Sequence, residues 1–506
     1  RQLTVSTQLE ALAGRYFAGN SYVPSAGSTF DAINPSTLEV LAPVAECTPE
    51  EVQSVVAAAN EAQAVWQGQD SKSRAASLHR IADHFEQRDL SPLAELLTRE
   101  MGKPYRESLG ELANVPGIFR YMAEMARDEA GHIAGTTQAG SFQYCRYEPY
   151  GVSVHIMPFN FPFLLLAWTA AASLAAGNAI VVKPAEATTL ATLAFMAFLD
   201  CLPAGLCSCV TGGGAVGQQL VDSEATHIVA FTGSMAVGKQ VNTSCARQLK
   251  PCIIEAGGSD AMLVMDSVDV DFAAAAACTA AFHLSGQVCT SSERFFVHEA
   301  LHDEFVAALV TRASALRVAD GLGRSEIGPL VSEAARNKVS ELVNSALSEG
   351  AQLACGGCVP TEAGPGWFYA PTVLTGVTPD MEIMNGEVFG PVASICRVGS
   401  LGEALQLAND TNFGLGAALL TERMDEAARG IDSLQAGMVW INNPMIDNDA
   451  LPFGGWKQSG LGRELGRDGL NAFRRSKMVI HDAVPRIQDW WYPYANSDFY
   501  SGPGAD

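Results

Sequence analysis

Two side chains have the chemical types and surroundings that covalent catalysis requires. Cys289 follows a Ser-Gly turn within residues 285–289, so its thiol could be presented at the end of a helix or loop. Glu255 ends the apolar segment CIIEA and precedes two glycines, a position that is unusual for a solvated charge. A partly exposed thiolate can attack an electrophilic carbon, and a carboxylate with a raised pKa can act as a general base. Taken singly, Cys289 is more simply a buried thiol and Glu255 a carboxylate at a turn.

Two glycine-rich segments could bind phosphate groups. Residues 212–217 carry the pattern GxGxxG of dinucleotide-binding turns, although a simple glycine-rich turn fits them at least as well. Residues 233–239 nearly match a Walker P-loop, but Gln240 stands where a magnesium-binding hydroxyl is needed, which excludes nucleotide hydrolysis. Gly233 and Ser234 still follow a predicted strand and precede a predicted helix. Backbone N–H groups at such a helix start can bind a pyrophosphate, and a plain strand-to-helix turn is the alternative.

The elements that must position these residues alternate between short apolar strands and helices. This alternation predicts a parallel sheet covered by helices on both faces, with ligands at the carboxyl ends of its strands. A second alternation starts near residue 267, with a helix at 271–283, a strand at 294–298 and a helix at 300–316. Thr48 and Glu51 form a capping box at the start of a mostly helical N-terminal region. The strands predicted for the first sheet are residues 152–157, 179–183, 206–210, 227–231 and 252–256.

Length, charge and cysteine usage limit the classes of protein to which the chain can belong. Its 506 residues exceed a single core and predict two or three domains. The net charge of −23 disfavours nucleic acids and anionic membrane surfaces as partners. Residues 161–182 carry no charge, but their proline, glycine and asparagine favour a buried helix and strand over a membrane span. The N-terminus has no signal-peptide pattern, and twelve cysteines without metal-ligand spacing indicate reduced thiols, no metal site and a cytoplasmic location.

Seven short motifs become specific when they are read together in their order along the chain. By these motifs the sequence resembles the aldehyde dehydrogenase superfamily over about residues 30–480. The motifs are PFNFP at 158–162, KPAE at 183–186, FTGS at 231–234, EAGG at 255–258, GQVC at 286–289, EVFGP at 387–391 and PFGGWKQSG at 452–460. The resemblance implies an α/β fold with a Rossmann-like cofactor domain, an α/β catalytic domain and a small β bridging element for oligomerisation.

The resemblance also implies a reaction. Cys289 would attack the aldehyde carbon, and the side-chain amide of Asn160 with the Cys289 backbone N–H would stabilise the resulting oxyanion. After hydride transfer to NAD, Glu255 would activate the water that hydrolyses the thioester to a free acid. Acylating relatives that use coenzyme A lack this glutamate, so Glu255 disfavours that alternative. A non-catalytic binding or structural member of the fold is a third reading, but both the nucleophile and the base are intact.

Cofactor residues follow from the same motifs. Lys183 and Glu186 match the positions that hold the adenosine ribose, and a carboxylate there repels a 2′-phosphate, which favours NAD over NADP. Glu387 and Phe389 resemble the residues that position the nicotinamide ribose and ring. One departure is Leu284, which with Ser285 replaces the frequent asparagine two residues before the Gly-Gln pair.

The substrate pocket is predicted to be apolar. Trp168 stands where succinate-semialdehyde relatives commonly carry an arginine that binds the substrate carboxylate, and tryptophan cannot do so. We therefore expect a neutral aliphatic or aromatic aldehyde as the substrate. Asp447 and Asp449 lie near the expected tunnel mouth and could instead favour cationic aminoaldehydes. The predicted pocket residues are Phe161, Leu165, Trp168 and Phe453.

The expected domain organisation has three parts. Residues 1–126 and 150–257 are predicted to form the NAD-binding domain, and residues 258–460 the catalytic domain. Residues 127–149 and 461–506 are predicted to form the bridging element and an aromatic tail. Its strand-like segments 142–147 and 477–480 would add strands to a partner's sheet, so we expect a homodimer or homotetramer.

Overall fold

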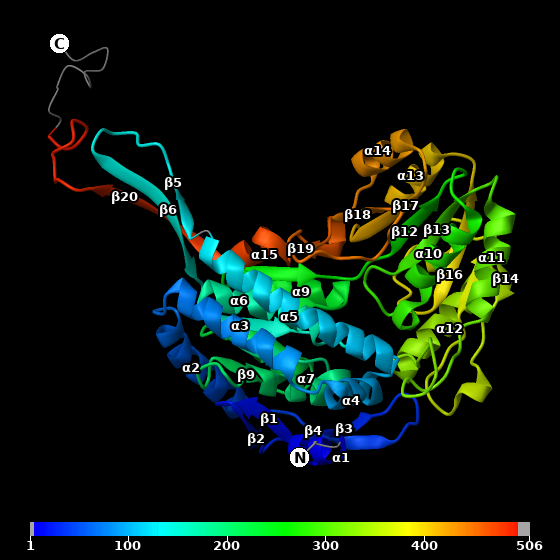
Figure 1. The fold of residues 1–506 in the computed structure, drawn as a ribbon, viewed down its shortest axis with the longest axis horizontal. Coiled ribbons are helices and arrows are strands. Elements are labelled where there is room, and N and C mark those ends of the chain that lie inside the picture. The colour runs from blue at the N-terminus through cyan, green and yellow to red at the C-terminus, as the bar shows by residue number, and fades with distance from the viewer. Residues whose placement is uncertain (1–4, 129, 494–506) are drawn as a thin grey trace, which may run out of the picture.

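The computed structural model describes residues 5–128 and 130–493, and the rest of the predicted aromatic tail lies outside the described residues. Two large sheets, each packed with helices, make up the body of the molecule (Figure 1). A long, narrow three-stranded sheet projects from this body at the upper left of the view. This is the α/β architecture that the alternating pattern predicts.

The first sheet has eight strands, and its central five are parallel. Apolar side chains fill these strands because helices cover both faces; every residue of β8, for example, is buried. All five strands predicted from the sequence are confirmed, with ends that differ by at most one residue. In sheet order the strands are β19 (Gly460–Leu461), β11 (Cys252–Glu255), β10 (Ile228–Thr232), β7 (Val152–Ile156), β8 (Ala179–Lys183), β9 (Cys207–Cys209), β1 (Arg15–Ala18) and β2 (Ser21–Pro24).

Most helices that pack around the first sheet come from the N-terminal half. The capping box of Thr48 and Glu51 is confirmed at the start of α2. The uncharged stretch 161–182 forms α6 and β8, and no helix of the described chain is long and apolar enough to cross a membrane. These helices are α1 (Val5–Leu12), α2 (Pro49–Trp66), α3 (Ser71–Gln87), α4 (Ser91–Met101), α5 (Tyr105–Asp128), α6 (Leu164–Ala176), α7 (Thr189–Met196), α8 (Gly214–Asp222), α9 (Met235–Ala246) and α15 (Gly466–Ala472).

The second sheet has seven strands, all parallel except the edge strand β14. In sheet order they are β14 (Gln352–Cys355), β15 (Thr372–Thr375), β16 (Val392–Val398), β13 (Ser292–His298), β12 (Asp260–Val264), β17 (Gly416–Leu420) and β18 (Met438–Ile441). Five helices accompany it: α10 (Val270–Phe282), α11 (His302–Ser314), α12 (Glu333–Ser348), α13 (Leu401–Asn409) and α14 (Met424–Ser433). Its two faces pack in two separate apolar cores, so the second sheet and its helices form a layered unit of their own.

Two small sheets complete the fold. The projecting sheet has the order β20-β6-β5, with β20 (Arg474–Asp482), β6 (Ser141–Pro149) and β5 (Gly131–Ile133), and it includes both predicted bridging segments. β3 (Thr29–Ile33) and β4 (Val40–Ala45) form a hairpin. Residues 461–473 were assigned to the bridging element from the sequence. In the structure they pack on the first large sheet and its helices, because β19 pairs with β11 and α15 contacts α5 and α6.

Candidate active site

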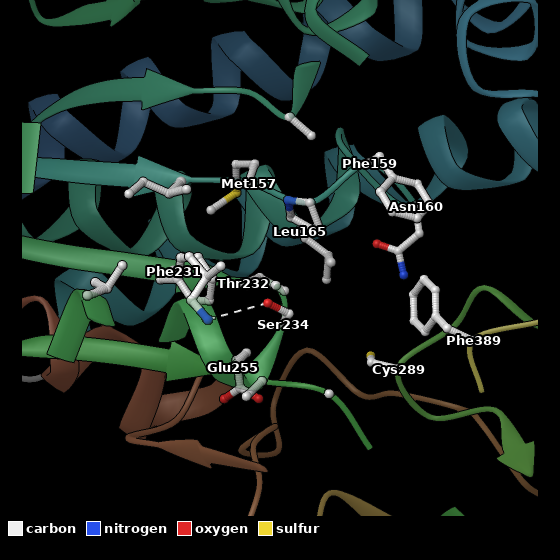
Figure 2. A pocket seen from close by; sticks show the side chains of 18 of the residues that line it. Met157, Phe159, Asn160, Leu165, Phe231, Thr232, Ser234, Glu255, Cys289 and Phe389 are labelled. Carbon is white, nitrogen blue, oxygen red and sulfur yellow. Dashed lines mark hydrogen bonds between the residues drawn. The ribbon is translucent and has the colours of Figure 1, made fainter. Parts of the chain in front are cut away.

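A cavity of about 610 Å³ lies at the carboxyl ends of β7, β8, β10 and β11, where residues of both large sheets meet. This is the edge at which parallel sheets bind ligands. Figure 2 shows side chains from these strands and from the Cys289 loop around a common space. The cavity is lined by all of the predicted site residues except Phe161 and Trp168, namely Asn160, Leu165, Lys183, Glu186, Gly233, Ser234, Glu255, Cys289, Glu387, Phe389 and Phe453.

The loop before Cys289 has an unusual backbone. Leu284, Ser285 and Gly286 all have positive φ values, of 53°, 57° and 74°. Only glycine fits the third position, since a Cβ there would lie 2.0 Å from the Gly390 carbonyl oxygen. The hydroxyl of Ser285 donates to the Gly328 carbonyl at 2.8 Å and fixes the turn. A left-handed backbone is costly for residues other than glycine and is found mostly at functional sites. This turn is fixed by its contacts and therefore holds the following cysteine in one position.

The thiol of Cys289 is partly exposed at the cavity wall, as a nucleophile must be. Its pKa is nevertheless raised well above the ordinary value, first by desolvation and then by four nearby carboxyl groups. These carboxyls belong to Asp260, Glu255, Glu387 and Glu464. In the absence of a positive charge in the cavity, residue 289 is therefore a neutral thiol.

Asn160 is held beside this loop by two hydrogen bonds. Its Nδ2 donates to the Gln287 carbonyl at 3.0 Å, and its Oδ1 accepts from the Phe161 backbone N–H at 3.0 Å. The side-chain amide is aimed at the space next to the thiol (Figure 2). An amide nitrogen has two hydrogens, so one remains to donate to an acceptor in the cavity.

Glu255 ends β11 and is 4% exposed. In Figure 2 its carboxylate points away from the labelled thiol. Glu464 lies close enough to raise its pKa, after desolvation, and Arg463 acts in the opposite direction. Glu464 is itself buried, with a pKa raised to about 8 by desolvation. Neither carboxyl has a hydrogen-bond partner in the described chain, so the pair holds a proton that isolated carboxylates would release.

The segment that carries Glu387 and Phe389 is fixed by buried polar contacts. Glu293 accepts hydrogen bonds from the backbone N–H groups of Val388 and Phe389, at 2.8 and 2.7 Å. This contact supports the left-handed backbone of Phe389, whose φ is 53°. Glu387 accepts from the Gly258 N–H at 3.1 Å. The Phe389 ring meets Phe159 edge to face at 5.9 Å between centroids, so an aromatic wall lines this end of the cavity.

The other end of the cavity carries the predicted ribose-binding residues. Lys183 ends β8, and its ammonium lies 3.5 Å from the carboxylate of Glu186. Gly233 and Ser234 connect β10 to α9, and the Ser234 hydroxyl caps the helix by accepting from the Val237 N–H at 3.4 Å. The strand-to-helix turn predicted from the sequence is therefore confirmed. Backbone amides of such a turn point toward an incoming anion.

Four aromatic or apolar residues were predicted to line a substrate tunnel, and the structure separates them. Leu165 and Phe453 line the cavity, and Trp168 packs against Phe453 with the rings tilted by 58° and their centroids 4.8 Å apart. Phe161 does not line the cavity, and its ring centroid lies 4.4 Å from the Lys103 ammonium. The cavity lining in the described chain includes neither Asp447 nor Asp449.

The sequence pattern of the Aldehyde dehydrogenase family matches residues 22–479. The chain belongs to the aldehyde dehydrogenase family. A betaine aldehyde dehydrogenase of Bacillus subtilis is 35% identical over 467 residues, which cover 91% of this chain and 95% of that protein. A putative aldehyde dehydrogenase of the same organism is 36% identical over 483 residues, 94% of this chain and 97% of the relative. The crystal structure of a betaine aldehyde dehydrogenase from Staphylococcus aureus in complex with NAD+ has a TM-score of 0.93 at 31% identity, covering 96% and 98% of the two chains.

Two sets of residues in this aldehyde dehydrogenase were not found from the sequence. Glu464 lies at the cavity because its backbone pairs with that of Phe453, with N–H to carbonyl hydrogen bonds in both directions. As a glutamate just past a predicted motif, it gave no sequence signal of its own.

The second set is the pair of Lys103 and Glu111, which form an ion pair of 2.6 Å with both side chains 0% exposed. Glu111 also accepts from the N–H groups of Phe163 and Leu164. It therefore caps α6, which has no capping residue of its own, and fixes the loop of Asn160.

We expect substitution of Lys103 by methionine to destabilise the enzyme strongly. The change would leave the Glu111 carboxylate buried without its partner, which typically costs about 3–5 kcal/mol. The melting temperature, measured by calorimetry, should fall by on the order of 5 °C. Arg99→Met is the matched control, because its ion pair with Glu95 is about one-third exposed and such pairs contribute little. Equal melting temperatures for the two variants would contradict the structural role of the buried pair.

Proposed function

We propose that this aldehyde dehydrogenase oxidises a neutral aliphatic or aromatic aldehyde to its carboxylic acid with NAD+, through a thioester on Cys289. The observation that carries the proposal is the common cavity of three groups: the thiol, the Asn160 amide and the Glu255 carboxylate. A nucleophile, an oxyanion donor and a base in one cavity are the groups that acyl chemistry followed by hydrolysis requires.

The residues would act in two stages. The Cys289 thiol gives its proton to solvent water as its sulfur bonds to the aldehyde carbon, and the new oxyanion accepts hydrogen bonds from the Asn160 amide and the Cys289 backbone N–H. The hydride of that carbon would then leave to the acceptor that bound NAD+ supplies, which converts the adduct into the thioester. Glu255 then takes a proton from a water molecule, whose oxygen attacks the thioester carbon and releases the acid and the free thiol. Hydrolysis uses water in place of the thiol of coenzyme A, and that water needs a base. The presence of Glu255 therefore favours this route over acyl transfer to coenzyme A.

The cavity also fits the dinucleotide. Lys183 and Glu186 would bind the adenosine ribose, Gly233 and Ser234 would face the pyrophosphate, and Glu387 with Phe389 would position the nicotinamide end. A side chain at Gly257 would lie 2.3 Å from the Glu387 carboxylate, so glycine keeps that approach open. NAD+ supplies the hydride acceptor when it is bound. The charged groups at the ribose end favour NAD over NADP.

The choice of aldehyde rests on the lining near the thiol. Leu165 and Phe453 with the buried Trp168 provide apolar surface, and the predicted aspartates do not line the cavity. A second candidate is a quaternary ammonium aldehyde, because the Trp168–Phe453 pair could bind a cation over an aromatic face. The names of the betaine aldehyde relatives favour the same candidate.

A panel of aldehydes separates these candidates. We expect kcat/KM for hexanal and benzaldehyde to exceed that for succinic semialdehyde and betaine aldehyde by at least about tenfold. The reason is that burying one charge without a partner costs at least the free energy that corresponds to a tenfold change in rate. Preference for betaine aldehyde would replace the neutral substrate by the cationic one. Preference for the semialdehyde would exclude both.

We also propose that the enzyme forms a homodimer or homotetramer through the projecting sheet. This sheet carries exposed apolar side chains, including Ile133, Met478 and Ile480, at 72%, 79% and 57% exposure, and such a surface is typical of an interface between copies. The double variant Met478→Lys/Ile480→Lys should lower the mass measured by light scattering. His481→Lys, on the opposite face of β20, is the control; an unchanged oligomer in the double variant would exclude this surface.

A cytoplasmic location is the remaining part of the proposal. It is supported by the twelve cysteines, all of which are free thiols in the structure. Thiols in this number persist in a reducing compartment.

A further inference from the structure

A second carboxylate, that of Glu46, lies next to Glu186 at the glycine turn of Gly213, one residue before Gly214 of the cavity lining. Glu46 follows β4, far from Glu186 in the sequence, and its Oε2 accepts a hydrogen bond from the Gly213 N–H at 2.9 Å. A point at the Cβ position of Gly213 is 3.4 Å from Glu186 Oε1 and 3.8 Å from Glu46 Oε2. The two carboxylates therefore flank the same glycine turn, which leads into α8.

One cation faces these two carboxylates. The Lys183 ammonium is 3.5 Å from Glu186 and close enough to Glu46 for the latter to oppose the lowering of the Lys183 pKa that burial causes. The cluster of Glu46, Lys183 and Glu186 thus has a net charge of about −1 at neutral pH. A ribose with free hydroxyls can bind to such a cluster as donor and acceptor, whereas a dianionic phosphate is repelled.

Glu46 also removes a site at which a phosphate could bind. Backbone N–H groups of a glycine turn that opens a helix are common anion donors. The Gly213 N–H is such a group, and the Glu46 carboxylate occupies it. A 2′-phosphate would have to displace this carboxylate as well as approach its charge.

From this arrangement we propose that Glu46 is a specificity-determining residue that excludes NADP together with Glu186. The proposal rests on the use of NAD proposed above. It implies that the loss of Glu186 alone leaves a strong preference for NAD, because the second charge and the occupied N–H remain.

The test compares the binding of adenosine 5′-monophosphate with that of adenosine 2′,5′-bisphosphate, by isothermal titration calorimetry. Glu46→Gln is the informative variant, because the glutamine oxygen can still accept from Gly213 while the charge is lost. We expect it to improve the affinity for the bisphosphate relative to the monophosphate about tenfold, and Glu46→Gln/Glu186→Gln to improve it by more than either single change. The gain should shrink at high salt.

Controls separate charge from geometry. Glu46→Asp keeps the charge and should keep the discrimination, whereas Glu50→Gln, at an exposed carboxylate in the first turn of α2, should have no effect. Equal changes in the affinities for the two ligands in Glu46→Gln, or no change in either, would overturn the proposal. The same would follow if Glu186→Gln alone produced the full relaxation found in the double variant.

Activity provides a second, independent measurement. The ratio of kcat/KM for NADP+ to that for NAD+, with a single aldehyde, should rise in Glu46→Gln. If no variant or wild-type enzyme formed NADH, the proposed function would fail. The ligand titrations would still decide the role of Glu46.

Discussion

Replacement of Cys289 by alanine is expected to lower NADH formation from any aldehyde by at least about 10⁴-fold. Alanine cannot form the bond to the aldehyde carbon, so no tetrahedral species collapses with transfer of a hydride. The rest of the cavity would be unchanged, because the preceding left-handed turn is fixed by Gly286 and by the Ser285 hydroxyl rather than by the thiol. Binding of NAD+, followed by fluorescence titration, should therefore be retained within a few-fold.

Cys278→Ala is the matched control for this prediction. Cys278 is also a partly exposed free thiol, but it lies on α10 and does not line the cavity. Its substitution should leave the turnover number unchanged. Turnover that survived in Cys289→Ala would remove the thioester route, and loss of turnover in both variants would indicate a general effect of cysteine loss.

The parts of the fold that the sequence predicts are those in which local pattern and burial agree. The five central strands of the first sheet are mostly apolar because both of their faces are covered, and such short apolar segments are visible in a single sequence. The helix that begins after Thr48 could be predicted for another reason, because the two residues of its capping box are only three positions apart in the sequence.

The predicted catalytic and cofactor-binding residues meet in one cavity because most of them sit at strand ends and turns. Lys183 and Glu255 are the last residues of two parallel strands, and parallel strands end at the same edge of a sheet. Their convergence follows from the topology once the strands are assigned. The resemblance to a family supplied the identity of the residues, and the topology explains why they lie together.

Contacts between segments that are far apart in the sequence could not be predicted from local sequence patterns. Phe161 was placed in the tunnel from its position in a motif, but it does not line the cavity, and its ring contacts the buried ammonium of Lys103. That contact joins the loop between α4 and α5 to the loop before α6. Glu464 reaches the cavity and Glu46 reaches the Gly213 turn by similar long-range packing, and no spacing rule relates them to Glu255 or Glu186.

Leu284 illustrates a conflict between local preference and tertiary structure. Leucine disfavours a left-handed backbone, so propensity predicts no such turn at this position. The side chain is fully buried in the core, and the gain from burial offsets the strain. A residue chosen for packing therefore stands at a position where backbone preference favours asparagine.

Glu255→Gln is expected to separate the two stages of the reaction. Hydride transfer needs the thiol and the oxyanion donors, so a burst of NADH close to one equivalent per active site should remain. Steady-state turnover should then fall by about 10²–10⁴-fold, because a glutamine amide cannot accept a proton from the attacking water. Hydroxylamine, which cleaves thioesters without a base, should restore turnover in the variant. Loss of the burst itself would show that Glu255 acts before the thioester forms.

The pH dependence of the hydrolysis step gives the final prediction, and Glu464 sets its direction. A carboxyl with a raised pKa is neutral at pH values below that pKa and cannot accept a proton from water, so hydrolysis should accelerate as the pH rises through the raised pKa of Glu255. The negative charge of Glu464 raises the pKa of Glu255. Glu464→Gln removes this charge, so the pKa of Glu255 should fall and the rising limb of the profile should move to lower pH. A limb that stayed in place, or moved to higher pH, would mean that the two carboxyls do not share their protons and that burial alone tunes the base.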